Sequence, residues 1–130
     1  MPDVVLDTHA CLYALTDPAR LGAAGRRLLK QGEAGRLVVW IPAAVVAEVV
    51  MLKELGRTLV GLPQLRTAME EAASLRFLPL DLRQLDEFSA LQAVRDPFDR
   101  LVISACRAVD GRLITRDARI EDTGLVRTAW

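Results

Sequence analysis

The sequence has little with which to bind zinc or to form disulfides. Its single histidine, His9, excludes a zinc site built from several histidines. There are only two cysteines, Cys11 and Cys106, and both lie in apolar helical patterns. We expect them to be buried thiols of a protein from a reducing compartment.

An excess of charge of either sign is also missing, since 17 basic residues balance 17 acidic ones. No overall field draws the chain onto nucleic acid or an anionic membrane, so a polyanion would have to bind through a local basic patch or a bound cation. The longest apolar run, AAVVAEVVML at 43–52, contains an acid and is too short to span a membrane. The N-terminus does not resemble a signal peptide, so a cytoplasmic location is expected.

What the chain does have is aliphatic residues arranged as alternating strands and helices. Its 130 residues are 52% hydrophobic but only 5% aromatic, which fits one domain with an aliphatic core. Short apolar runs predict strands at 4–6, 36–41, 76–80 and 112–115, with a last strand within 125–130. Helical patterns separate these runs. The sequence therefore predicts an α/β fold over 1–130, with a central parallel sheet covered by helices on both faces.

Two acids follow predicted strands directly. Asp7 comes after VVL, and Asp117 comes after RLIT and Arg116. In open parallel sheets, sites form beyond the carboxyl ends of the strands where the strand order reverses. Each acid alone could instead cap the next helix, and the Thr8 and Thr115 hydroxyls could be ordinary turn donors.

Glu48 lies in the middle of the apolar run 43–52. A helix of this composition is expected to be buried over most of its circumference, where an unpaired carboxylate costs several kcal/mol. A narrow solvent-exposed strip or an arginine partner would also explain the residue. Its apolar setting nevertheless makes it a candidate site residue.

The stretch RDPFDR at 95–100 places two acids at the start of a helix predicted over 97–109. If Asp96 is the N-cap, Pro97 takes the first helical position and Asp99 the third, which are the positions these residue types favour. Helix capping alone would explain both acids. A helix N-terminus also helps to keep a carboxylate ionised, so Asp99 could serve a site while Asp96 caps the helix.

Carboxylates that converge from these segments would raise each other's pKa or repel one another unless a cation screened them. Carboxylate and water oxygens suit Mg²⁺ or Mn²⁺, whereas zinc favours histidine and cysteine. The chemistry that such a pocket serves is chiefly phosphoryl transfer. The sequence thus favours metal-dependent hydrolysis of a phosphate ester.

Four segments also resemble a known family. They are VVLDTHACLYAL, IPAAVVAEV, RDPFDRLVISACRA and LITRD, and they occur in family order over essentially the whole chain. The sequence is similar to PIN-domain ribonucleases of the kind found as VapC-type toxins. This resemblance implies an endoribonuclease that uses Mg²⁺ or Mn²⁺, acts on RNA, pairs with a cognate antitoxin protein and forms a homodimer.

The resemblance also implies roles for individual residues. The catalytic and metal-binding set is Asp7, Glu48, Asp99 and Asp117, with Asp96 as an auxiliary metal ligand and Thr8 and Thr115 as supporting hydroxyls. Arg100 and Arg116 flank two of these acids. They could bind phosphate or neutralise carboxylates, and neutralisation is the favoured interpretation.

Two other functions are open at this point. A phosphatase could use Asp7 as a nucleophile, and a trapped aspartyl-phosphate would support it. Such enzymes mostly need a pocket lysine, and the only lysines, Lys30 and Lys53, lie at no predicted strand end. A non-catalytic α/β scaffold could bind a partner through the helical segment 57–75, and absence of metal binding would favour it.

Overall fold

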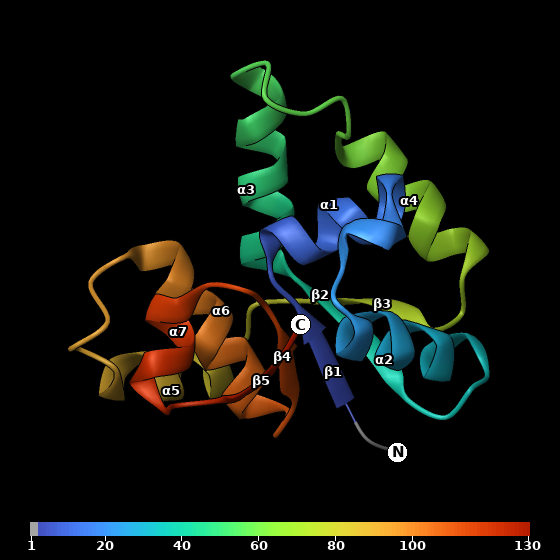
Figure 1. Ribbon diagram of the computed structural model, residues 1–130. Helices are drawn as coiled ribbons and strands as arrows, with labels where there is room; N and C mark the ends of the chain where they lie inside the picture. Colours follow the sequence, from blue (N-terminus) through green and yellow to red (C-terminus); the bar gives the residue numbers. More distant parts are fainter. Residues whose placement is uncertain (1–2) are drawn as a thin grey trace.

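The computed structural model describes residues 3–130 and contains one five-stranded sheet. The strands are β1 (Asp3–Leu6), β2 (Val38–Pro42), β3 (Leu75–Leu78), β4 (Arg112–Ile114) and β5 (Arg127–Ala129). Their order is β3-β2-β1-β4-β5, and every neighbouring pair is parallel (Figure 1). The predicted α/β class and parallel sheet are confirmed, and β3 lies at an edge as Pro79 suggests.

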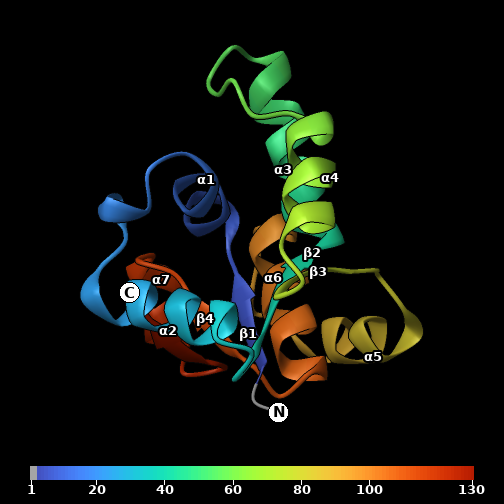
Figure 2. The same ribbon diagram turned by 90° about the vertical axis from the view of Figure 1, so that its right-hand side faces the viewer.

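Helices cover both faces of this sheet. They are α1 (Thr8–Thr16), the 3-10 turn η1 (Pro18–Arg20), α2 (Ala23–Glu33), α3 (Ala43–Glu54), α4 (Leu62–Glu71), α5 (Leu82–Ala90), α6 (Pro97–Ala108) and α7 (Ala118–Thr123). Figure 2 shows α2 on one side of the strands and α5 and α6 on the other. In both views α3 and α4 stand beyond the carboxyl end of β1. None of the helices in residues 3–130 has the length and hydropathy needed to cross a bilayer.

The core is aliphatic and centred on β1. Val5 and Leu6 are fully buried, as are Leu113 and Ile114 of the adjoining β4. A strand covered on both faces reads as an unbroken apolar run, which explains VVL. Cys11 and Cys106 are free, buried thiols as predicted, and burial raises the pKa of each to about 12.

The segment DPARLG at 17–22 begins with an Asp-Pro pair, which is typical of a helix start, but no α-helix begins there. Asp17 makes no side-chain capping bond, Pro18–Arg20 forms only a 3-10 turn, and α2 begins at Ala23. Gly22 precedes that helix because the Trp130 backbone packs against it; a Cβ there would lie 2.4 Å from the Trp130 carbonyl carbon. A tertiary contact, not the local capping signal, sets this helix start.

The expectation that the apolar helix at 43–54 is buried over most of its circumference is wrong. Only Val45 and Val49 of α3 are buried, and Met51 is 38% exposed. The helix projects past the sheet (Figure 1), and most of its apolar side chains are only half-buried. Glu48 is therefore half-buried, with room for both a protein partner and solvent.

Candidate active site

The strand order brings Asp7 and Asp117 to one place. The chain runs outward from β1 to β2 and β3, then returns past β1 to form β4, so the order reverses between β1 and β4. Leu6 pairs with Ile114, and the Asp7 amide donates to the Ile114 carbonyl at 3.2 Å. Both acids therefore follow adjacent strand ends at the switch point where such sheets bind ligands.

Each of these two acids also caps a helix. Asp7 is the N-cap of α1, where its Oδ1 accepts from the Ala10 amide at 2.8 Å. Asp117 is the N-cap of α7, where its Oδ1 accepts from the Arg119 amide at 2.9 Å. The buried Thr115 hydroxyl accepts from the Asp117 amide at 3.1 Å and fixes the turn. Capping occupies one carboxylate oxygen of each acid, and the second oxygen of Asp117, Oδ2, accepts from Arg119 Nη2 at 3.1 Å.

The remaining acids reach the same region from α3 and α6. Glu48 Oε2 accepts a 2.8 Å hydrogen bond from the Thr8 hydroxyl, which lies next to Asp7. Asp96 caps α6 by accepting from the Asp99 amide at 3.0 Å. Asp99 lies in the first turn of that helix, where the backbone dipole favours a negative charge. The two acids of RDPFDR therefore differ in role: Asp96 caps the helix, and Asp99 faces the site.

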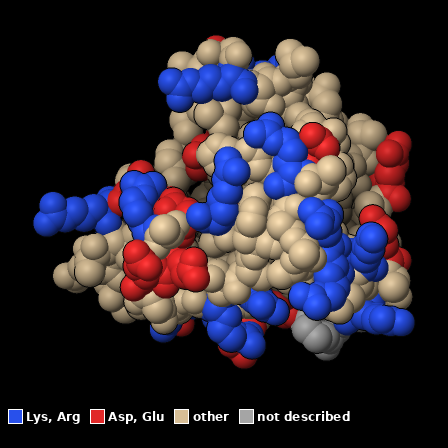
Figure 3. All heavy atoms as spheres, viewed as in Figure 1, with Lys and Arg blue, Asp and Glu red and all other residues tan. Residues whose placement is uncertain are grey.

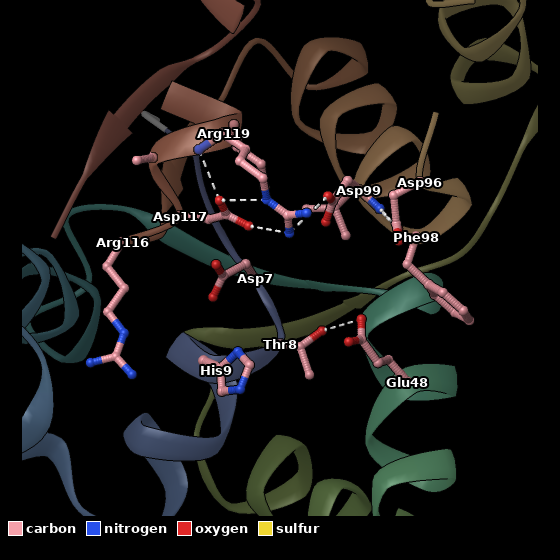
Figure 4. Close-up of a pocket in the computed structure, with 13 residues that line it drawn as sticks. Asp7, Thr8, His9, Glu48, Asp96, Phe98, Asp99, Arg116, Asp117 and Arg119 are labelled. Carbon is pink, nitrogen blue, oxygen red and sulfur yellow. Dashed lines mark hydrogen bonds and ion pairs between the residues drawn. The ribbon is translucent and has the colours of Figure 1, made fainter. Parts of the chain in front are cut away.

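These side chains surround a single hollow of about 480 Å³. Figure 4 shows Asp7 near its centre, Asp117 and Asp99 on one side and Glu48 on the other. Its lining includes the five predicted acids, Asp7, Glu48, Asp96, Asp99 and Asp117, together with Thr8, His9, Phe98, Arg116 and Arg119. Within residues 3–130 the fold brings every acid singled out from the sequence to one hollow.

The two arginines that flank the acids in the sequence, Arg100 and Arg116, make different contacts in the structure. Arg100 turns away from the acids: its guanidinium donates to the Phe88 carbonyl at 2.6 Å and stacks over the Phe88 ring at 3.9 Å. Arg116 lines the hollow, but its Nη2 donates to the Tyr13 hydroxyl at 3.0 Å. Neither arginine forms an ion pair with any acid in the described part of the chain.

The cation that neutralises the acids is Arg119, which sequence reasoning missed. Its Nη2 lies 3.1 Å from Asp117 Oδ2 and 3.8 Å from Asp99 Oδ2, so it bridges α7 and α6. The Arg119 side chain is 79% exposed, so water screens these interactions. A basic residue two positions after an N-cap acid was the only local signal, and it does not reveal the contact with α6.

The carboxylates perturb one another's proton affinity. Burial raises the pKa of Asp7, and hydrogen bonds from Thr115 and Ala10 offset this only in part. Burial, followed by the charges of Asp96 and Asp117, raises the pKa of Asp99 to about 6. Asp117 shows the opposite effect, because its hydrogen bond with Arg119 lowers its pKa. The hollow therefore holds more negative charge than Arg119 neutralises.

The donor set fits a hydrated hard cation better than an all-protein cage. Within residues 3–130, no three His, Cys, Asp or Glu side chains come close enough together to hold a metal ion by themselves. Mg²⁺ is commonly bound through one or two carboxylates and keeps several waters, so a wide ring of carboxylates suits it. After burial, the charges of Asp96 and Asp117 raise the pKa of Asp99, and a divalent cation would screen these charges.

The chain is similar to known proteins in both sequence and fold. The family model described as "PIN domain" matches residues 4–125. The fold is similar to a chain in the crystal structure of VapBC2 from Rickettsia felis bound to a promoter DNA fragment, with a TM-score of 0.71, 14% identity, and 98% and 97% of the two chains covered. It is also similar to a chain of DNA-bound VapBC from Salmonella typhimurium, with a TM-score of 0.70, 14% identity, and 99% and 98% covered. No curated protein matches the sequence.

Proposed function

The chain belongs to the PIN-domain family, and we propose that it is a metal-dependent endoribonuclease that acts as the toxin of a toxin–antitoxin pair. The observation that carries this proposal is the single hollow into which Asp7, Glu48, Asp99 and Asp117 converge from four separate segments. PIN domains are nucleases, which makes hydrolysis of nucleic acid the reaction to consider first.

In this proposal the four carboxylates would hold Mg²⁺ or Mn²⁺, one or two of them directly and the others through its coordinated waters, and Asp96 would assist as an auxiliary ligand. When bound, such an ion lowers the pKa of a coordinated water and offsets the charge of the phosphate. The chain's own contribution is orientation. The Ala10 amide fixes Asp7 at 2.8 Å, and the Thr8 hydroxyl fixes Glu48 at the same distance. Rigid carboxylates of this kind lower the cost of assembling the site.

The partner part of the proposal rests on the structural neighbours. Those from Rickettsia felis, Salmonella typhimurium and Haemophilus influenzae are VapBC structures, and a further neighbour is a structure of FitAB bound to a DNA fragment. This supports a cognate antitoxin protein as the partner. Homodimerisation and a cytoplasmic location complete the proposal, with RNA as the substrate.

A non-catalytic scaffold is the second candidate, because Leu59 in the segment 57–75 is 89% exposed and leaves an apolar side chain open to a partner. The phosphatase alternative finds no such support. Neither lysine lines the hollow, and Lys53 Nζ donates instead to the Leu59 carbonyl at 3.2 Å.

The test is cleavage of a mixed pool of structured RNAs by the purified chain without antitoxin. Mg²⁺, Mn²⁺ and chelator conditions would be run beside Asp7→Asn and a control, Asp86→Asn, which changes an exposed acid of α5 outside the hollow. Cuts that need metal, persist in Asp86→Asn and vanish in Asp7→Asn would support the proposal. Absence of cleavage together with absence of Mn²⁺ binding would overturn it in favour of the scaffold.

A further inference from the structure

Among residues 3–130, Arg116 is the cation of the hollow that forms no ion pair with an acid. It follows β4 by two residues and is exposed. Figure 4 shows it across Asp7 from Glu48, with its guanidinium group pointing away from Asp117. Arg119 is already engaged with Asp117 and Asp99. Basic and acidic side chains are interspersed over the face in Figure 3, so any attraction for a polyanion must be local.

Two aromatic rings hold the Arg116 guanidinium in place. Its Cζ lies 5.5 Å from the ring centroids of both Tyr13 and Trp130, and its Nη2 donates to the Tyr13 hydroxyl at 3.0 Å. The two rings meet edge to face, 6.1 Å apart. A long side chain fixed in this way loses less entropy when it binds a ligand. The remaining guanidinium donors are available to an anion.

A second arginine strengthens the local positive field. The Arg20 Cζ lies 4.4 Å from the Tyr13 ring centroid, so two guanidinium groups share one ring. Neither forms an ion pair with an acid anywhere in residues 3–130. Like charges gathered without a counter-ion favour the binding of an anion between or beside them.

Anchoring of Trp130 does not account for Arg116. The Trp130 carbonyl accepts from the Gly25 amide at 2.7 Å, and its backbone packs on Gly22. The strand before it is held by the Thr115 amide, which donates to the Ala129 carbonyl at 2.9 Å. Backbone contacts therefore fix this part of the chain independently of the arginine.

We propose that Arg116, oriented by Tyr13 and Trp130, binds a backbone phosphate of single-stranded RNA next to the phosphate that is cut. This inference rests on the proposed nuclease function. The chemistry is a charge-assisted contact between a guanidinium and a phosphodiester, which needs a planar, permanently charged donor. The proposal also implies a path for the substrate, because the RNA strand would run from the acids toward Tyr13.

The experiment compares Arg116→Gln with Arg112→Gln, which removes the same charge from the opposite end of β4, outside the hollow. Binding of a fluorescent single-stranded RNA would be measured against salt in an Asp7→Asn background, and kcat and KM in the active chain. We expect Arg116→Gln to raise Kd and KM about tenfold and to reduce the salt slope by about 0.7, the value for one phosphate contact. We expect kcat to change by less than about twofold, and Arg112→Gln to leave all these values unchanged.

Two further variants separate binding from a structural role. Arg116→Lys should keep the salt slope while losing part of the affinity, because the charge remains but the planar fork is lost. Tyr13→Phe should keep the slope and raise KM by less than Arg116→Gln does, since only the hydroxyl is removed.

An Arg116→Gln protein that cleaves RNA with unchanged KM and salt slope would overturn the inference and leave the nuclease function standing. So would a loss confined to melting temperature or to kcat. A wild-type chain that neither binds nor cuts RNA would overturn the nuclease function and this inference together.

Discussion

Replacement of Asp99 by asparagine should stabilise the metal-free protein while destroying its activity. The change removes a carboxylate that burial and the charges of Asp96 and Asp117 disfavour, since its pKa is raised from 3.8 to about 6. Asparagine has the same shape and carries no charge. The single favourable contact that is lost is the ion pair with Arg119 at 3.8 Å, which is long and exposed.

The size of the effect follows from the pKa of Asp99. A rise from 3.8 to about 6 corresponds to at most about 3 kcal/mol at pH 8. The side chain is 27% exposed, so solvent screening reduces this to about 1–2 kcal/mol. Loss of a negative charge from the first turn of α6 costs about 0.5 kcal/mol. The net gain is therefore about 1 kcal/mol, or about 3 °C in melting temperature for a domain of this size.

The pH dependence has a definite sign. Between pH 3.8 and about 6 the folded state binds more protons at Asp99 than the unfolded state does, so wild-type stability falls as pH rises through that window. Above about pH 6 the penalty is complete, and below pH 4 it vanishes. The stability gap between variant and wild type should therefore be present at pH 8 and absent at pH 4.

The assay is thermal unfolding in chelator and in Mn²⁺, with Asp86→Asn as the charge-matched control. Wild type should gain about 2.7 kcal/mol at a Mn²⁺ concentration of 100 times Kd. Asp99→Asn should lose most of that gain and all cleavage. A variant that melts below wild type in chelator at pH 8, or that gains as much from Mn²⁺, would refute the reasoning.

Three other changes test separate parts of the structure. Asp7→Asn should reduce metal-dependent RNA cleavage by more than about 100-fold without lowering the melting temperature, because asparagine still offers an acceptor to the Ala10 amide; partial activity would exclude an essential role. Glu48→Gln keeps an acceptor for the Thr8 hydroxyl, so the cleavage rate should fall while melting stays within about 2 °C; the reverse pattern would mark a structural glutamate. Gly22→Ala should lower stability by about 2 kcal/mol, measured by urea unfolding, since its Cβ would lie 2.4 Å from the Trp130 carbonyl carbon; an unchanged midpoint would show that this contact yields easily.

Local patterns predict much of this structure because several elements obey local rules. VVL reads as a buried strand since both faces of β1 are covered, and Asp96 caps α6 as the spacing of RDPFDR predicts. The assignment of Asp7, Glu48, Asp99 and Asp117 to catalysis stays a prediction, although the fold brings them to one hollow.

What local patterns could not predict depends on contacts between distant segments. The Thr8–Glu48 hydrogen bond joins residues 40 positions apart, and its existence depends on where α3 crosses the end of β1. Arg119 reaches Asp99 on a different helix. The apolar composition of α3 suggests burial. Burial depends, however, on which elements pack around the helix, and α3 extends past the sheet.

The order of the strands also makes the site divisible. The loop at 55–61 between α3 and α4 separates a first segment with β1, β2, Asp7 and Glu48 from a second with β3, β4, β5, Asp99 and Asp117. A chain opened at this loop would give two inert fragments, each with two of the four carboxylates proposed for catalysis. The hollow would form again only when β1 paired with β4 across the break. The same topology that builds the site would then report fragment reassembly, with RNA cleavage as its signal.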